Sequence, residues 1–262
     1  MKLEQIEINY KIHSDLYNEV IQIIEKNEFE NEFPIYYEVL TDCSNRLDTL
    51  FTSLMLIAKN GDMYSSQILY RAIIELFYKT FFLTSLLSKE KNDESAQHFK
   101  VHLFLSEWIA VQMGCLEMDD LVNEVESKTN FVQYIRDKFP NLREFNKANQ
   151  KEISQAIRKF GLKEIVKYLN DSFSEKEIGN FFTKILPEYS KASSFVHGGP
   201  YASTIVKNFQ KKGEIQTELE RIVSIAFSCV SIAKENCLFS FKLHPDDMID
   251  LLNKFHEIRK NK

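Results

Sequence analysis

The strongest pattern in the chain is a spacing of apolar residues at every third or fourth position, which is the period of an α-helix. On the predicted helix over 35–59, the repeating apolar positions are Val39, Leu40, Cys43, Leu47, Leu50, Phe51 and Leu54. A turn signal follows at Asn60-Gly61-Asp62, and residues 63–88 are then apolar on most of the helical circumference. A helix of this second kind is buried on most sides, so we expect it at the centre of the fold, with Asp62 as its N-cap.

Weaker versions of the same pattern predict further helices. Their approximate ranges are 14–27 with Ser14 as the cap, 94–113, 119–139, 151–160, 162–170, 174–197, 214–241 and 245–259. The helix over 174–197 opens on Ser174 and Glu177, a capping box, and contains Pro187, which should kink or restart it. No alternating strand pattern is present. We predict an all-α fold, a bundle of about eight to ten helices in a single domain over 1–262, with a weak subdivision near 141–150.

Composition agrees with a helical core and limits the expected partners. The 262 residues include only 7 glycines and 5 prolines, and 44% are hydrophobic. The formal net charge of −5 gives no overall attraction to nucleic acid or to an anionic membrane. Lys207, Lys211 and Lys212 form a local basic cluster, which we interpret as a solvated face.

Two further features bear on location. The N-terminal stretch MKLEQIEINY is charged, and the most apolar run, 68–87, contains three charged residues, so we expect neither a secretory signal nor a spanning helix. None of the four cysteines forms a C-x-x-C pair, and they lie far apart or on apolar runs: Cys43, Cys115, Cys229 and Cys237. We therefore predict buried free thiols, a cytoplasmic location and no membrane partner.

Several familiar site motifs are missing from the sequence. It contains no glycine-rich phosphate loop, no G-x-S-x-G nucleophile motif and no H-E-x-x-H metal motif. His98 and His102 have the i, i+4 spacing that places two imidazoles on one helical face, but a third metal ligand is not apparent nearby. We prefer to interpret them as surface histidines, and we predict neither a metal ion nor another cofactor.

Three charged residues interrupt the central helix. Arg71, Glu75 and Lys79 follow one another at i, i+4 and i+8, which forms one narrow stripe. Burying an Arg and a Glu costs free energy unless they pair and find further hydrogen bonds. Two interpretations stay open: the stripe is a solvent edge or a clasp to a neighbouring helix, or it lines a polar pocket.

The stretch SSFVHGGPYAS, residues 193–203, is the second unusual feature. Gly198 can supply a left-handed helix cap, and the helix dipole favours His197 in the last turn, so both residues have a structural explanation. That explanation does not account for the second glycine and Pro200. A face of hydroxyl-bearing side chains also leads to His197: Tyr189, Ser190, Ser193 and Ser194. A structural and a functional interpretation therefore both stay open.

Together these two features carry a resemblance to a known group. The pattern R-x-x-x-E in an apolar helix, followed far downstream by Y-x-x-x-S-x-x-x-H-G, resembles all-α bacterial proteins similar to the HEPN superfamily and to abortive-infection proteins. Its residues here are Arg71 and Glu75, then Tyr189, Ser193, His197 and Gly198. The resemblance covers about residues 35–241 and implies a helical bundle that dimerises and cuts RNA without metal.

The resemblance also implies roles for individual residues. His197 would act as general acid and base, Arg71 or Lys191 would stabilise the charge on the scissile phosphate, and Glu75 would orient Arg71. HEPN ribonucleases place an Arg a few residues before the His, whereas Lys191 stands before His197 here. Lys191 and His197 would lie about 240° apart around a straight helix. The remaining candidate ligand contacts are Tyr189, Ser190, Ser193, Ser194 and Lys79.

Three functional hypotheses follow. The first is a metal-independent ribonuclease of bacterial defence, with RNA as its partner and a homodimer as its assembly. The second is a non-catalytic helical sensor or antitoxin-like module that binds a small ligand or a protein through the same residues. The third is a scaffold in which small residues of the 214–241 helix let another helix approach, namely Ser224, Ser228 and Ser231 beside Arg221.

Overall fold

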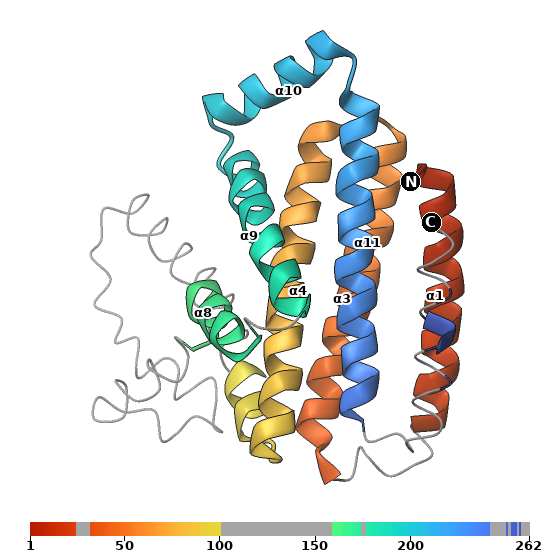
Figure 1. Ribbon diagram of the computed structural model, residues 1–262, viewed down its shortest axis with the longest axis vertical. Helices are drawn as coiled ribbons and strands as arrows, with labels where there is room; N and C mark the ends of the chain where they lie inside the picture. The colour runs from red at the N-terminus through yellow and green to blue at the C-terminus, as the bar shows by residue number, and fades with distance from the viewer. Residues whose placement is uncertain are drawn as a thin grey trace, which may run out of the picture. The chain divides into compact units, whose positions relative to one another are not determined.

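The structure, a computed structural model, describes residues 1–24, 32–100, 159–173, 177–241, 250, 253–255 and 257. Every secondary-structure element in this part of the chain is a helix, which confirms the predicted all-α fold (Figure 1). The bounds are α1 Leu3–Ile24, α3 Pro34–Lys59, α4 Met63–Glu90, α8 Leu162–Phe173, α9 Glu177–Val196, α10 Pro200–Lys212 and α11 Ile215–Ser240.

The chain divides into two compact units, and the second interrupts the first. Residues 1–93 and 166–262 form one unit, and residues 94–165 form the other. All the candidate site residues lie in the first unit. The subdivision expected near 141–150 falls outside the described residues, so the single-domain organisation stays a prediction.

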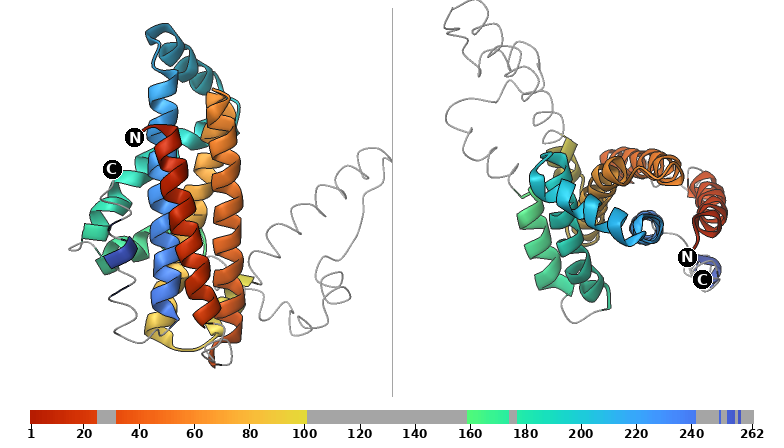
Figure 2. Two further views of the ribbon diagram at one scale, coloured as in Figure 1. Left: turned by 90° about the vertical axis from the view of Figure 1, so that its right-hand side faces the viewer. Right: turned by 90° about the horizontal axis from the view of Figure 1, so that it is seen from above.

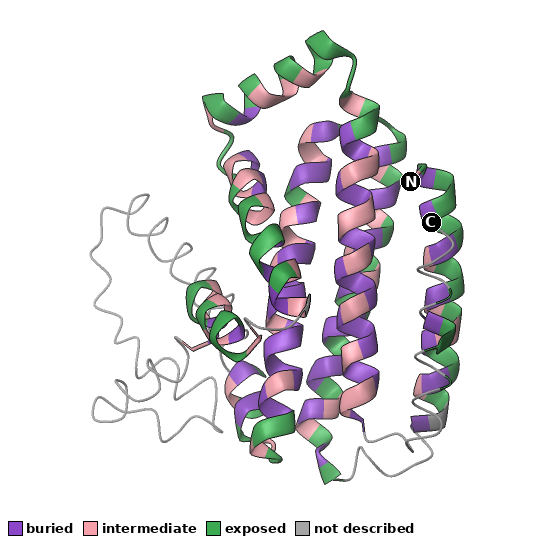
Figure 3. Ribbon diagram, in the orientation of Figure 1, coloured by how far each residue is buried: buried purple, intermediate pink, exposed green. Residues whose placement is uncertain are grey.

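The predicted central helix is central to the first unit. α4 packs against α3, α9 and α11, while α11 also packs against α3 and α1, so that α9 and α1 lie on opposite sides of the bundle (Figures 1 and 2). Large aromatic side chains of α3 and α4 are fully buried, among them Tyr36, Phe51, Tyr70 and Phe77. Figure 3 shows buried residues along most of α4 and α11, except at the start of α11 and the end of α4.

The predicted start of α4 is confirmed. The Asp62 carboxylate accepts a hydrogen bond of 3.0 Å from the backbone N–H of Ser65, as an N-cap does. The predicted start of the first helix is wrong, because α1 begins at Leu3 and Ser14 lies in its middle. Leu3, Ile6 and Tyr17 already belong to one buried helical face, and that periodicity extends the helix far ahead of Ser14.

Two other differences concern the C-terminal half. α9 continues as one helix through Pro187, so the restart that the proline allowed does not occur. α10 was not predicted, although a short apolar stripe with helical spacing, Ala202, Ile205 and Phe209, is present; only Ala202 of its 13 residues is buried. α10 lies across the end of the bundle and is largely exposed (Figures 1 and 3).

Several other predictions fall partly or wholly outside the described residues. These are most of the helix over 94–113, those over 119–139 and 151–160, the capping residue Ser174, the last helix and His102. Of the cysteines, Cys43, Cys229 and Cys237 are buried and unpaired as predicted, whereas Cys115 is not described. Burial raises the pKa of the Cys43 thiol to about 11.

One described helix meets the length and composition of a membrane span, and it is α11 rather than the run over 68–87. Its most apolar window has a mean hydropathy of 1.5, but 67% of that window is buried inside the protein. Core helices pass the same test, so this finding is weak evidence for a membrane location.

Candidate functional site

The charged stripe of α4 meets the hydroxyl-bearing face of α9. Arg71 donates from Nε to Ser193 Oγ over 3.1 Å and from Nη2 to Tyr189 Oη over 2.8 Å. Its Nη1 lies 3.3 Å from Glu75 Oε2, and its Cζ lies 5.0 Å from the centroid of the Tyr189 ring. The two helices run antiparallel, because Tyr78 contacts Phe182 near one end of α9 and Tyr64 contacts Phe195 near the other. We call Arg71, Glu75, Lys79, Tyr189 and Ser193 the Arg71 network.

Glu75 is the negative centre of this network. Lys79 Nζ lies 2.8 Å from Glu75 Oε1, and Tyr189 Oη donates to Glu75 Oε2 over 3.5 Å. Burial alone would raise the pKa of the Glu75 carboxyl, but the hydrogen bond and charge of Lys79 and the charge of Arg71 outweigh it and lower the pKa. Two cations against one carboxylate leave the network with a formal charge of +1.

The network is only partly buried, which matters for its chemistry. The Arg71 side chain is 29% exposed. A guanidinium carries five N–H donors, and the contacts to Ser193, Tyr189 and Glu75 use three of them. The remaining donors and the surplus positive charge suit an anion such as a phosphate oxygen.

His197 makes no hydrogen bond or ion pair to Arg71 or Glu75, although the roles that the resemblance implies would bring the three side chains together. It follows Val196, the last residue of α9, and its side chain is exposed. Within the described part of the chain the imidazole has no hydrogen-bond or ion-pair partner. It lies one helical turn beyond Ser193 on the same side of α9, so it extends the line of the Arg71 network without touching it.

Local backbone geometry explains the two glycines and the proline that follow His197. Gly198 has a φ of +62°, the left-handed conformation of a helix C-terminus, and its N–H bonds to the Phe195 carbonyl over 3.2 Å. Gly199 is the extended N-cap residue of α10, and Pro200 occupies the first turn of that helix. Tyr64 Oη donates to the same Phe195 carbonyl over 2.7 Å and ties the junction to α4.

Besides His197, three predicted site residues do not belong to the Arg71 network. Lys191 lies on the opposite side of α9, because a shift of two positions from Tyr189 or Ser193 turns a helix by about 200°. Its Nζ bonds to Glu218 Oε1 over 2.7 Å. The hydroxyls of Ser190 and Ser194 bond to carbonyl oxygens of α9 itself, at 3.2 Å and 2.7 Å. Lys191 is therefore not placed to act together with Arg71.

Lys191 belongs instead to a second ionic network, which the sequence analysis missed. Arg221 of α11 bonds to both carboxylate oxygens of Glu188, at 3.0 Å and 2.8 Å, and its Nε bonds to Glu218 at 2.7 Å. Despite burial, the hydrogen bonds from Arg221 and Lys191 lower the pKa of Glu218. The i, i+3 spacing of Glu218 and Arg221 is the only sequence signal for this pair. Together the two networks fix α9 to α4 and to α11.

A basic helix follows His197 in the chain. α10 contains Lys207, Lys211 and Lys212 and no acidic residue, and all three lysines are exposed. Tyr201, in its first turn, is 64% exposed. The local cluster that we interpreted as a solvated face therefore lies on a separate helix that begins three residues after His197. No group of three or more potential metal ligands occurs in the residues that the structure describes.

Comparison with known proteins places the chain in a family. The model of a family of unknown function (DUF5677) matches residues 36–216. The chain belongs to that family. The matched part of this DUF5677 protein contains the whole Arg71 network, His197 and α10. No curated protein and no solved structure matches the chain.

Proposed function

We propose that this DUF5677 protein is a metal-independent endoribonuclease of the defence type, which binds RNA along α10 and cleaves it at His197. The observation that carries the proposal is the position of an exposed imidazole between a cationic network and a basic helix. The resemblance of the R-x-x-x-E and Y-x-x-x-S-x-x-x-H-G patterns to HEPN-like proteins supports the same activity.

The chemistry assigned to His197 is proton transfer in RNA cleavage. The imidazole takes the proton from a ribose 2′-hydroxyl, and the 2′-oxygen attacks the adjacent phosphorus. The bond from phosphorus to the 5′-oxygen breaks, that oxygen takes up a proton, and the products are a 2′,3′-cyclic phosphate and a 5′-hydroxyl end. An imidazole suits this step because it exchanges protons near neutral pH.

The neighbouring residues supply binding. The three lysines of α10 neutralise backbone phosphates, and the exposed Tyr201 ring offers a surface on which a base can stack. The free donors of Arg71 face the growing negative charge on phosphate when RNA lies along α9 towards α10. In the proposed homodimer, His197 of a second copy would protonate the departing 5′-oxygen.

The test is cleavage of labelled single-stranded RNA in the presence of EDTA. We expect the wild type to produce 2′,3′-cyclic phosphate ends and His197→Gln to lose at least about a hundredfold in rate, since general acid and base catalysis contributes this much. Ser190→Ala is the matched control, because Ser190 is also exposed on α9 and bonds only within that helix. Intact RNA with the wild type, or equal cleavage by His197→Gln, would contradict the proposal.

A second candidate function has its own support. Three donors of Arg71 are already used inside the protein, one of them towards Glu75, as expected of a clasp that holds two helices in register. This favours a non-catalytic module that binds RNA or a protein partner on α10. Under that function, Lys207→Ala with Lys211→Ala abolishes binding, while His197→Gln leaves it unchanged and no RNA is cut.

A further inference from the structure

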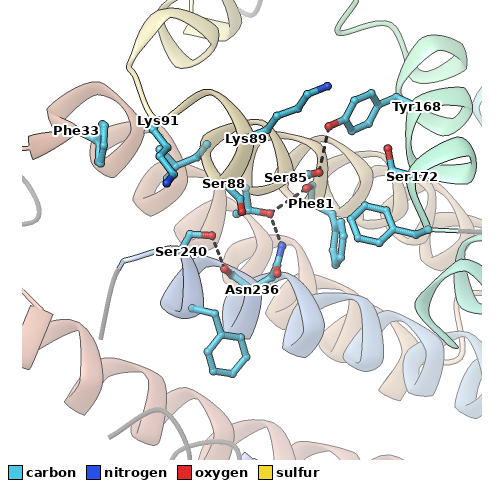
Figure 4. Close-up of a pocket in the computed structure, with 14 residues that line it drawn as sticks. Phe33, Phe81, Ser85, Ser88, Lys89, Lys91, Tyr168, Ser172, Asn236 and Ser240 are labelled. Carbon is cyan, nitrogen blue, oxygen red and sulfur yellow. Dashed lines mark hydrogen bonds between the residues drawn. The ribbon is translucent and has the colours of Figure 1, made fainter. Parts of the chain in front are cut away.

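A separate pocket lies at the other end of α4 from α10. It has a volume of about 600 Å³ and is formed by the last turns of α4, the later part of α8, the last turns of α11 and Phe33 (Figure 4). Pockets of this size hold small organic ligands, whereas a bare inorganic ion would leave most of the volume unfilled. With a rise of about 1.5 Å per residue, Ser88 lies about 25 Å along α4 from Arg71, so the pocket is distinct from the proposed RNA site.

The charged residues that line the pocket are all basic. Its residues all belong to the described part of the chain, and they include Lys89 and Lys91 but no carboxylate. Figure 4 shows Lys91 beside Phe33 and Lys89 beside Tyr168. The Lys89 Nζ lies 6.0 Å from the centroid of the Tyr168 ring. Two unneutralised lysines around one cavity attract an anionic group.

The rest of the lining combines aromatic surface with hydroxyl groups. Phe81 and Phe173 meet edge to face with ring centroids 5.6 Å apart, and Phe239 also lines the cavity. Aromatic side chains of this kind bind planar rings through stacked or edge contacts. Ser85 and Tyr168 bring their hydroxyl oxygens within 3.4 Å of each other, so α4 and α8 present a joined polar edge.

The opposite wall contains one hydrogen bond between helices. The Asn236 side-chain amide of α11 donates to Thr84 Oγ1 of α4, while Ser240 Oγ donates to the backbone carbonyl of Asn236 within α11 over 2.8 Å. The bond from Asn236 to Thr84 holds the ends of α4 and α11 together, so the walls are formed before a ligand arrives. A preformed cavity loses less free energy in ordering when it binds.

We propose that this pocket binds an aromatic anion, a planar ring system joined to a phosphate or a carboxylate. The ring packs against Phe81, Phe173 and Phe239, and Lys89 and Lys91 hold the anionic group at the rim. The hydroxyls of Ser85 and Tyr168 bond to polar atoms on the ring or on its linker. The site does not depend on the proposed ribonuclease activity, because it shares no residue with α10 or the Arg71 network.

The test is isothermal titration calorimetry of the full chain with four probes. Adenosine 5′-monophosphate and indole-3-acetate carry both a ring and an anionic group, adenosine carries only the ring and ribose, and inorganic phosphate carries only the charge. We expect one or both of the first two probes to bind with Kd below about 1 mM and at least about tenfold more tightly than adenosine or phosphate. Which of the two binds shows which combination of ring and anionic group the pocket accepts. No binding of either, or equal binding of adenosine or phosphate, overturns the proposal.

Variants locate the binding. Lys89→Ala with Lys91→Ala should weaken it about tenfold or more, and Ser88→Trp should block the cavity from an exposed position. Lys11→Ala with Lys184→Ala removes the same charge elsewhere and should leave the affinity unchanged. Lys207→Ala with Lys211→Ala should also leave it unchanged; if that variant abolishes binding while the pocket variants do not, the ligand belongs to α10 and the proposal fails.

Discussion

Lys234 Nζ lies 2.6 Å from Asp48 Oδ2, and this ion pair joins α11 to α3 inside the first unit. The lysine side chain is fully buried, whereas Asp48 is 26% exposed. Tyr10 of α1 donates to the other Asp48 oxygen over 2.8 Å, and the ammonium lies 4.2 Å from the centroid of the Tyr17 ring. Burial lowers the pKa of Lys234, while the charge of Asp48 opposes that change. The pair therefore connects three helices around one buried cation.

Because Lys234 is more deeply buried than Asp48, substitutions of the two residues should differ in their effect on the free energy of unfolding. Asp48→Asn should lower the free energy of unfolding by about 3 kcal/mol, because it leaves a buried ammonium without its counter-charge. Lys234→Met should lower the free energy of unfolding by clearly less, since Asp48 keeps its hydrogen bond from Tyr10 and its contact with solvent. Urea unfolding of the two single variants and the double variant measures the difference and the coupling. Equal losses for the two single variants would show that the pair is not a buried one.

The Arg71 network should behave as a clasp between α4 and α9 whether or not it also binds a ligand. Arg71→Lys keeps the charge but loses the fork that reaches both Ser193 and Tyr189, and we expect a loss of about 1 to 3 kcal/mol in unfolding free energy. Tyr189→Phe removes one hydroxyl and should cost about 1 kcal/mol.

Thermal and urea unfolding check this pair of changes. Ser190→Ala is again the control, because its hydroxyl bonds only within α9, and it should change the free energy by less than about 0.5 kcal/mol. An Arg71→Lys variant as stable as the wild type would leave the network without a structural role and would favour ligand binding at Arg71.

Stability should fall in acid because of two carboxylates. The folded protein lowers the pKa of Glu75 and of Glu218 below the usual 4.5. Each group therefore contributes stability that is fully present above the unfolded pKa and is lost as the pH falls through the folded pKa. Unfolding free energy measured by urea titration from pH 7 to pH 3 should decrease, and most of the decrease attributable to these groups lies below about pH 5.

Neutral replacements separate this effect from general acid unfolding. Glu75→Gln and Glu218→Gln should each lower stability at pH 7 and flatten the dependence on pH below about 5. Glu4→Gln, on the exposed side of α1, should leave the curve unchanged. A curve that keeps its full slope in both glutamine variants would mean that other groups cause the acid sensitivity.

The strength of the apolar pattern decided which helices could be predicted from the sequence. α3 and α4 were predicted closely, since Leu47, Phe51, Tyr70 and Phe77 belong to long buried faces whose period is unmistakable. α10 was missed although Ala202, Ile205 and Phe209 recur at helical spacing, and of these only Ala202 is buried. Pro200 in its first turn and the left-handed Gly213 after its end were the usable signals.

In the candidate site, too, the residues that recur at regular helical spacing were the ones that could be predicted. Arg71, Glu75, Tyr189 and Ser193 were predicted to be special from their i, i+4 spacing, and the structure joins them because that spacing aligns side chains on one helical face. Lys191 was chosen for its distance along the chain from His197, although its angular position on α9 directs it to Glu218. The second ionic network depends on which helices become neighbours, and local sequence does not contain that information.

The two glycines after His197 provide a matched pair for the last prediction. Gly198 has a φ of +62°, and the Tyr64 hydroxyl would lie 3.5 Å from an added Cβ, whereas Gly199 has a φ of −74° and open space around it. Gly198→Ala should cost about 1 kcal/mol or more, because a Cβ disfavours the left-handed conformation. Gly199→Ser should be neutral or slightly stabilising, because serine is a good N-cap for α10.

Both variants leave His197, Tyr201 and the α10 lysines in place, so they also test how precisely this junction sets the proposed site. If the orientation of α10 relative to His197 matters, Gly198→Ala should lower RNA cleavage or RNA binding by more than its loss of stability explains, while Gly199→Ser keeps both. Unfolding curves and RNA titrations on the same preparations provide the comparison. A Gly198→Ala variant with unchanged stability would contradict the left-handed conformation itself.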